Sequence, residues 1–268
     1  MDNLHTLVIK RWHLKMIDRM HLLAAQCLQM KSIHIGLSGY SYKPWQGAKR
    51  FYPEKLKSTE FLKYYAGRFN TVELDGIWYR LPTEHTVQGW LEQTPSSFIF
   101  SPKAHRQITH RHRLKPDALA FVETMLDRLA PLIKQKRLGP VLLQLPPNFQ
   151  RDDDRLNTFF EQVPRTVRWA LEFRHESWHV PEVEKLLRHY GVSWVAADTD
   201  ESPAQIRDTA EFWYVRLRRS EYTPATLSKW AARFTDMARQ GKECYIYCKH
   251  EDEGSPWIWA DRLLELTG

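Results

Sequence analysis

Cysteine is scarce in this sequence, and long apolar runs are missing. Three cysteines among 268 residues cannot provide a disulfide framework. Cys244 and Cys248 stand four residues apart in an apparent strand, about 13 Å between Cα atoms, which is too far for a bridge. No apolar run reaches the roughly 18–20 residues that a membrane-spanning helix needs. These features predict buried, unpaired cysteines, no association with a membrane and a cytoplasmic setting.

Signature motifs of several enzyme classes are also absent. The sequence contains no Gly-x-Gly-x-x-Gly or Walker loop and no Gly-x-Ser-x-Gly nucleophile elbow. It has no Cys-x-x-Cys pair, a usual mark of a zinc site. We therefore predict no organic cofactor and assign no metal ligands, while a divalent metal stays possible through scattered carboxylates and histidines.

The first 30 residues differ from the rest of the chain. They hold four methionines and neither glycine nor proline. They match neither a signal peptide, for lack of a long apolar stretch and cleavage site, nor a transit peptide, because they contain two aspartates. Residues 1–31 also carry about +3 of the formal net charge of +7. We expect residues 1–30 to be an extension outside the fold and residues 31–268 to form one domain.

Strand-like and helical patterns alternate from residue 33 onward. Apolar runs predict strands at Ile33–Ser38, Thr71–Leu74, Phe98–Ser101, Val141–Leu145, Trp169–Phe173, Ser193–Ala197, Phe212–Leu217 and Cys244–Cys248. Helical periodicity predicts helices at Thr59–Phe69, Glu84–Gln93, Asp117–Lys136, Asp154–Gln162, Glu182–His189, Thr226–Arg239 and Trp257–Leu266. Eight strand-then-helix units over about 235 residues predict an α/β fold, a single-domain (β/α)8 TIM barrel.

Alternation along these strands places polar side chains on one face. In "WALEFR", Glu172 and Arg174 share a face with Ala170, opposite the bulky apolar residues. In a barrel the first set would point inward, and active sites form at the carboxyl ends of the strands. The other strands end in the same way, at Ser38, Glu73, Ser101 with Lys103, Gln144, Asp198, Arg216 and Lys249. Eight such endings predict a site at the mouth.

Mixed charges converging on one cavity are typical of acid/base chemistry or anion capture. We predict Glu172, Glu73 and Asp198 as catalytic residues. An alternative for Glu172 and Arg174 is a structural ion pair.

The segment "KAHRQITHRHRLK" at 103–115 contains no acid, so it predicts either an anion-binding rim or a solvated loop. Aromatic residues that follow strand ends predict stacking on a ligand or packing at the barrel top.

Several sequence blocks carry a family resemblance. "IGLSGYSYKPWQG", "FYP", "FNTVELDGIWYRLP", "FIFSPKAHRQITH", "GPVLLQLPPNF", "LEFRHESW" and "VAAD" occur in this order. They resemble the signature blocks of domain-of-unknown-function family 72, the YecE-like proteins, over roughly residues 33–268. The resemblance implies a TIM-barrel fold and implies no reaction. The barrels of sugar isomerases and endonuclease IV suggest a carbohydrate or nucleic-acid ligand by analogy.

Three hypotheses follow for function. The first is an enzyme that acts by carboxylate acid/base chemistry on an anionic, phosphate-bearing small molecule, sugar or nucleotide. The second is a nucleic-acid-binding protein without catalysis, and the third is a divalent-metal isomerase or endonuclease. The predicted substrate-binding residues line the inferred mouth: Ser38, Tyr40, Trp45, Tyr79, Lys103, His105, Gln144, Arg174, Trp178, Arg216 and Lys249.

Overall fold

The computed structural model describes residues 33–249 and 254–268, so the predicted extension at 1–30 lies outside the described residues. Every predicted strand is present within one or two residues of its predicted ends. The strands are β1 Ile33–Ser38, β2 Thr71–Leu74, β3 Ile99–Pro102, β4 Val141–Gln144, β5 Trp169–Glu172, β6 Ser193–Trp194, β7 Ala196–Asp198, β8 Phe212–Leu217 and β9 Glu243–Cys248. The sixth predicted strand is therefore divided at Val195 into β6 and β7.

Helices follow the strands at the predicted places. The α-helices are α2 Phe61–Ala66, α3 Glu84–Gln93, α4 Leu119–Arg128, α5 Ala130–Lys134, α6 Asp153–Gln162, α7 Pro181–Tyr190, α8 Pro224–Arg239 and α9 Pro256–Thr267. Short helical turns are η1 Lys43–Trp45, η2 Ser58–Glu60, η3 Asp75–Trp78, η4 Gln107–Arg111, η5 Pro116–Ala118 and η6 Glu176–Trp178. Local sequence sets several ends: Thr83 and Thr223 accept a hydrogen bond from the first turns of α3 and α8. Gly191 ends α7 in the left-handed conformation.

All strand pairs are parallel, and the strands form two sheets. One sheet has the order β3-β2-β1-β9-β8-β7, and the other has the order β4-β5-β6. In the described part of the chain, β3 meets β4 only through isolated bridges, Phe100 with Leu138 and Lys103 with Leu142. The parallel α/β order of the prediction is confirmed. Closure into a TIM barrel is not, because these bridges do not make a continuous ladder.

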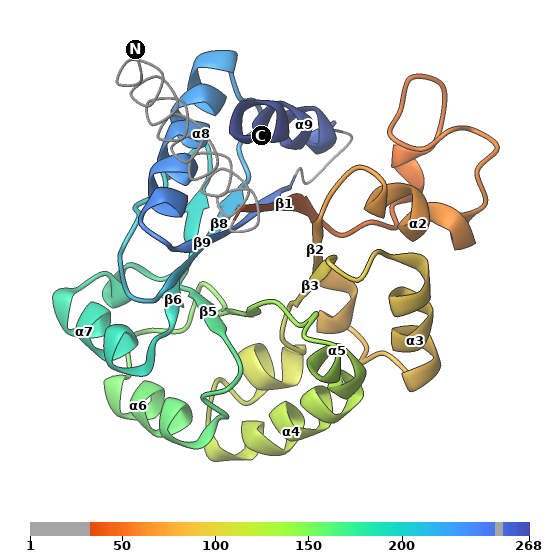
Figure 1. Ribbon diagram of the computed structural model, residues 1–268. Helices are drawn as coiled ribbons and strands as arrows, with labels where there is room; N and C mark the ends of the chain where they lie inside the picture. The colour runs from red at the N-terminus through yellow and green to blue at the C-terminus, as the bar shows by residue number, and fades with distance from the viewer. Residues whose placement is uncertain (1–32, 250–253) are drawn as a thin grey trace, which may run out of the picture.

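The helices lie around the outside of the strands, as Figure 1 shows. The larger apolar core, under the helices, contains the strand residues predicted to face outward, such as Leu37, Val72 and Leu171. A smaller cluster on the other face of the strands includes Leu142, Tyr214 and Tyr247 together with Ala170. Alternation therefore sorts most strands as predicted.

The sixth predicted strand is the exception. Val195 belongs to the inner cluster, and the register places Ala197 beside the inward-facing Arg216, whereas Asp198 lies beside Leu217 of the outer core. The prediction that Asp198 points inward is therefore wrong by one residue of register. A shift by one residue moves every side chain of a strand to the opposite face.

Two further findings concern parts of the molecule outside the mouth. Cys244 and Cys248 are unpaired and buried. No helix among residues 33–249 and 254–268 has the length and apolar character needed to cross a membrane.

Candidate functional site

Arg216 lies at the centre of the charged side chains at the carboxyl ends of the strands. It comes from β8 and has no solvent-exposed surface. Its Nη1 donates to Glu172 Oε2 at 2.6 Å, and its Nη2 donates to Glu73 Oε1 at 2.8 Å. Burial would lower the pKa of Arg216, but the two carboxylates hold it well above its ordinary value. We call Arg216, Glu73 and Glu172 the ion triad.

Glu172 is held by more than the triad. Gln144 donates to its Oε1 at 2.9 Å, and Arg174 donates to the same oxygen at 3.2 Å. Arg218 lies 3.8 Å from that oxygen. Burial alone would raise the pKa of Glu172, but the guanidinium groups of Arg216, Arg174 and Arg218 keep it well below its ordinary range. Such a carboxylate is a weak proton acceptor and a poor general acid near neutral pH.

Glu73 is also fully occupied. Tyr214 donates to its Oε2 at 2.7 Å, and its Oε1 accepts from Arg216 and from the Ser38 hydroxyl. The Ser38 oxygen lies 2.8 Å from Asp75 Oδ2 as well. A hydroxyl carries a single proton, so Ser38 links the two carboxylates while donating to one at a time.

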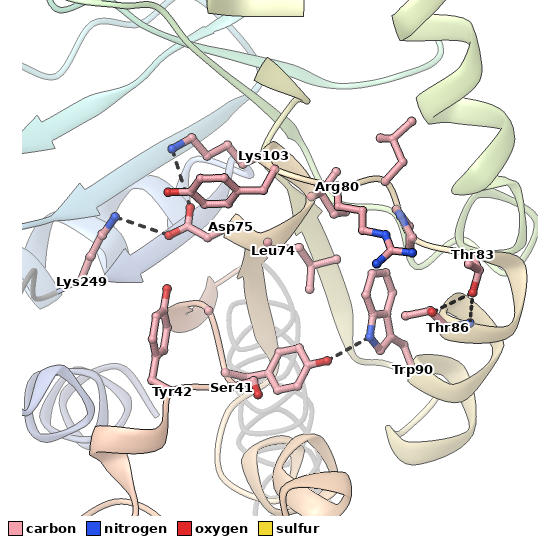
Figure 2. Close-up of a pocket in the computed structure, with 17 residues that line it drawn as sticks. Ser41, Tyr42, Leu74, Asp75, Arg80, Thr83, Thr86, Trp90, Lys103 and Lys249 are labelled. Atoms are coloured by element: carbon pink, nitrogen blue, oxygen red, sulfur yellow. Dashed lines mark hydrogen bonds and ion pairs between the residues drawn. The ribbon is translucent and has the colours of Figure 1, made fainter. Parts of the chain in front are cut away.

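Two lysines lie close to Asp75 at the edge of this network. Lys249 Nζ lies 3.4 Å from Asp75 Oδ2, and Lys103 Nζ lies 4.0 Å from Oδ1. Figure 2 shows the two ammonium groups directed at different oxygens of the Asp75 carboxylate. Burial would raise the pKa of Asp75, but Lys249, Arg216 and Lys103 lower it below its ordinary value.

These lysines face a cavity of about 690 Å³, which we call the mouth pocket. Aromatic side chains form much of its wall: Tyr40, Tyr42, Tyr79 and Trp90. Tyr40 accepts a hydrogen bond from Trp90 Nε1 at 3.0 Å, which fixes both rings. Gly39 has a positive φ of 89°, and a Cβ there would come within 2.4 Å of the Tyr42 ring. Glycine thus allows the chain after β1 to turn along the pocket.

A second, smaller cavity of about 360 Å³ lies beside Glu172 and Arg174. Arg218 and Arg207 also line it, but both have carboxylate neighbours: Arg218 approaches Glu172, and Arg207 pairs with Glu184 at 2.7 Å. The cations of both cavities therefore have carboxylate neighbours: Arg174 and Arg218 share Glu172, as Lys103 and Lys249 share Asp75.

Most predicted site residues are brought together, and some are not. The ion triad, its hydrogen-bond partners and the mouth pocket include the following members of the predicted set: Glu73, Glu172, Ser38, Tyr40, Tyr79, Lys103, Gln144, Arg174, Arg216 and Lys249. Asp198 lies elsewhere and accepts hydrogen bonds from Arg219 at 2.9 Å and Tyr222 at 3.0 Å. It has no contact with the ion triad among the described residues.

Two predicted aromatic contacts are core residues instead. Trp45 is 6% exposed and packs edge-on against Trp257. Trp178 is 1% exposed, stacks on Phe173 and donates to the Phe149 carbonyl at 2.7 Å. Both follow strand ends, but they lie in short helical turns with the rings buried, and neither lines the mouth pocket.

The basic segment 103–115 is neither a plain loop nor a uniform rim. Its residues Gln107–Arg111 form one π-helical turn with Ile108 and Thr109 buried. His105 lies outside the lining of the mouth pocket and accepts a hydrogen bond from the Gln107 amide at 3.4 Å. Burial, with Lys103 and Arg174 nearby, lowers the pKa of His110 from 6.5 to about 4.

A metal centre receives no direct support from the geometry. No group of three or more His, Cys, Asp or Glu side chains suited to a metal ion occurs among residues 33–249 and 254–268. His250, one of the histidines that follow the predicted strands, lies outside the described residues.

Sequence reasoning missed Asp75 and Arg218. Asp75 follows the last residue of β2, so the strand pattern ends before it. Its signal was present, because Asp75 stands two residues after Glu73 and alternation continues past the strand. Arg218 stands in the same relation to Arg216.

Comparison with known proteins shows the family to which the chain belongs. The chain resembles a DUF72 family protein of known structure from Thermotoga maritima, with a TM-score of 0.76 and 28% identity over 87% of this chain and 98% of that one. A DUF72 family protein from Enterococcus faecalis shares the fold, with a TM-score of 0.68 and 19% identity over 88% and 95% of the two chains. The UPF0759 protein YunF of Bacillus subtilis is 24% identical over 87% of this chain and 94% of its own length. Residues 34–268 match the family described as "Protein of unknown function DUF72", and the chain belongs to that family.

Proposed function

We propose that this protein is a (β/α)8-barrel enzyme that binds an anionic small molecule, with a phosphate or carboxylate group, in the mouth pocket. The carrying observation is the lysine pair, Lys103 and Lys249, that shares the single carboxylate of Asp75 at the pocket wall. Two cations around one anion leave a positive charge for a ligand. Apolar walls with a few convergent polar groups are typical of small-molecule sites.

The barrel is part of the proposal. The two sheets approach one another at β3 and β4, where the Ala104 amide donates to the Leu142 carbonyl at 2.8 Å. At the other junction, the Val195 amide donates to the Leu171 carbonyl at 3.0 Å, which continues the pairing between β5 and the segment leading to β7. These contacts favour eight strand positions in one ring with a mouth at their carboxyl ends.

The geometry favours a different division of roles from the predicted carboxylate pair. Glu172 and Glu73 have their oxygens occupied by Arg216 and its neighbours. We assign them to holding Arg216 in place. Asp75 and Lys103 border the pocket with weaker mutual contact, so they are the better candidates for proton transfer.

Thermal unfolding in different anions tests the proposal. Phosphate should raise the melting temperature more than chloride does at matched ionic strength. A ligand at about 100 times its Kd stabilises by about 2.7 kcal/mol. In a chain of this size that corresponds to roughly 5–10 °C, from about 2–4 °C per kcal/mol. Replacing Lys103 and Lys249 together by Met should abolish the difference between the two anions.

The matched control removes two lysines elsewhere. Lys185 and Lys229 are exposed on α7 and α8, so their replacement by Met lowers the net charge equally without touching the pocket. The proposal is wrong if the control loses the phosphate effect as fully as the pocket variant does. A steep salt dependence of binding to an oligonucleotide would instead favour the nucleic-acid hypothesis.

A further inference from the structure

The environments of the two pocket lysines differ. Lys249 approaches Asp75 Oδ2 at 3.4 Å, and Ser38 shares that oxygen. Lys103 stands 4.0 Å from Oδ1, beyond hydrogen-bonding range. Asp75 Oδ1 accepts no hydrogen bond from any side chain or amide in the described ranges. Lys103 is thus near a buried carboxylate oxygen without being bound to it.

Lys103 is also the more enclosed amine. Its side chain is 12% exposed, against 22% for Lys249. Burial lowers the pKa of Lys103 below its ordinary value, and Asp75 and Glu73 oppose that change while Arg216 and Lys249 reinforce it. The groups that face it from other elements also include His110 and the Trp78 ring, whose centroid lies 5.3 Å from Nζ. The ring favours the ammonium form, but burial and two neighbouring cations act in the other direction.

A lysine in a desolvated pocket beside another cation is a recognised form of activated amine nucleophile. Such amines attack aldehydes and ketones. The mouth pocket offers space for a small carbonyl compound next to Lys103, and Lys249 can attract a carboxylate or phosphate on the same molecule.

We propose that Lys103 is a catalytic amine that forms an imine with a small anionic carbonyl compound, such as a 2-oxo acid, in the mouth pocket. This deepens and rests on the proposed anion-binding function. Lys103 Nζ attacks the carbonyl carbon, and the carbonyl oxygen takes up protons and leaves as water. The ammonium form plus the carbonyl compound gives a protonated imine plus water, so neither oxidant nor reductant is needed.

Asp75 is suited to the proton movements of this step. Its free Oδ1 faces the amine, and can accept a proton from the nitrogen as the carbon–nitrogen bond forms and return one to the departing oxygen. Lys249 keeps Asp75 ionised and supplies the positive charge for the carboxylate of the bound molecule.

Reductive trapping tests the imine. The full-length protein is incubated with pyruvate and sodium borohydride, and the adduct is located by mass spectrometry of the intact chain and of its peptides. Hydride addition turns the imine into a stable secondary amine. We expect one adduct, on Lys103, that survives in Lys249→Arg and is lost in Lys103→Arg, which keeps the charge but has no amine. Melting curves of both variants verify folding.

Protection in the unaltered protein gives a second measurement that does not depend on any variant. Inorganic phosphate should suppress the adduct on Lys103 and leave modification of exposed lysines such as Lys185 unchanged. Acetone, which lacks the charge, should give much less adduct than pyruvate does.

The outcomes separate the two proposals. Equal trapping of acetone and pyruvate on Lys103 would support the amine chemistry and contradict anion binding. A phosphate-dependent rise in melting temperature without any adduct on Lys103 would overturn the imine and leave the anion site standing. Adducts spread evenly over exposed lysines would overturn the imine as well.

Discussion

Replacing Arg216 by Met tests whether the ion triad depends on a single buried cation. The substitution keeps an unbranched side chain of similar length and removes the guanidinium that lies between Glu73 and Glu172. Removing one partner of a buried ion pair typically costs about 3–5 kcal/mol, because the remaining charge has no compensation. Here two carboxylates would be left.

The remaining contacts limit that cost. Glu73 would keep hydrogen bonds from Tyr214 and Ser38, and Glu172 would keep those from Gln144 and Arg174. We therefore expect the lower end of the range, about 3 kcal/mol. This corresponds to a fall in melting temperature of roughly 6–12 °C. Replacing both glutamates by Gln in the same chain should recover most of the loss.

The pH dependence provides a sharper measurement. In the unaltered protein the pKa of Glu172 is depressed, so its contribution is present above the ordinary pKa and is lost as the pH falls towards the folded-state value. In the Met variant the largest of the three guanidinium contributions that lower this pKa is missing, so the pKa of Glu172 rises from its value in the unaltered protein and protonation at lower pH relieves the uncompensated charge. The difference in stability between the two proteins should shrink from about pH 7.5 to about pH 5.

Urea and thermal unfolding at both pH values test this expectation, with Arg219→Met as the control. Arg219 is 31% exposed, and its buried partner Asp198 would keep hydrogen bonds from Tyr222 and the Ala204 amide, so the loss of Arg219 should cost less, about 1 kcal/mol. Equal destabilisation by the two substitutions, or a loss from Arg216→Met that does not change with pH, would show that the buried triad does not behave as a charged unit.

Three further predictions concern residues around the mouth. Trp178→Ala should destabilise by about 3–5 kcal/mol in urea unfolding, while phosphate should still raise the melting temperature, because Trp178 is a core residue. The pKa of His110 is lower in the folded protein than in the unfolded chain, so the unfolded chain takes up a proton first and stability falls between pH 6.5 and about 4. His110→Gln should flatten this fall in stability. An unchanged thermal profile would contradict this. Asp75→Asn should tighten phosphate binding in calorimetry by removing the carboxylate that both pocket lysines approach.

The arrangement of strands and helices was largely predictable because apolar periodicity follows from burial. Runs such as Ile33–Ser38 and Phe212–Leu217 appear at their predicted bounds, and alternation identifies which residues face the helices. The failure at Asp198 has a local cause. Residues 195–197 are small and apolar and fit either face of the strand, so their sequence pattern does not determine which of them faces inward.

The site was less predictable, because its pairing depends on which strands are neighbours in space. Glu172 and Arg174 stand two residues apart in sequence and do interact at 3.2 Å. The stronger partner of Glu172 is Arg216, 44 residues away, at 2.6 Å and fully buried. Alternation can place all three side chains on one side of the strands, but it cannot rank their distances.

The ion triad and the mouth pocket form one connected network, and this connection accounts for a buried ionic group that stability alone does not require. Apolar residues of the same volume often stabilise a core as well as a buried ion pair does. The triad, however, continues through Ser38, whose single hydroxyl proton lies between Glu73 and Asp75. Arg216 pairs with Glu73 and also lowers the pKa of Asp75, the carboxylate that both pocket lysines share. Together with Lys249 and Lys103, Arg216 keeps Asp75 ionised, with its free Oδ1 4.0 Å from Lys103 Nζ, which is the arrangement that proton transfer in the pocket requires.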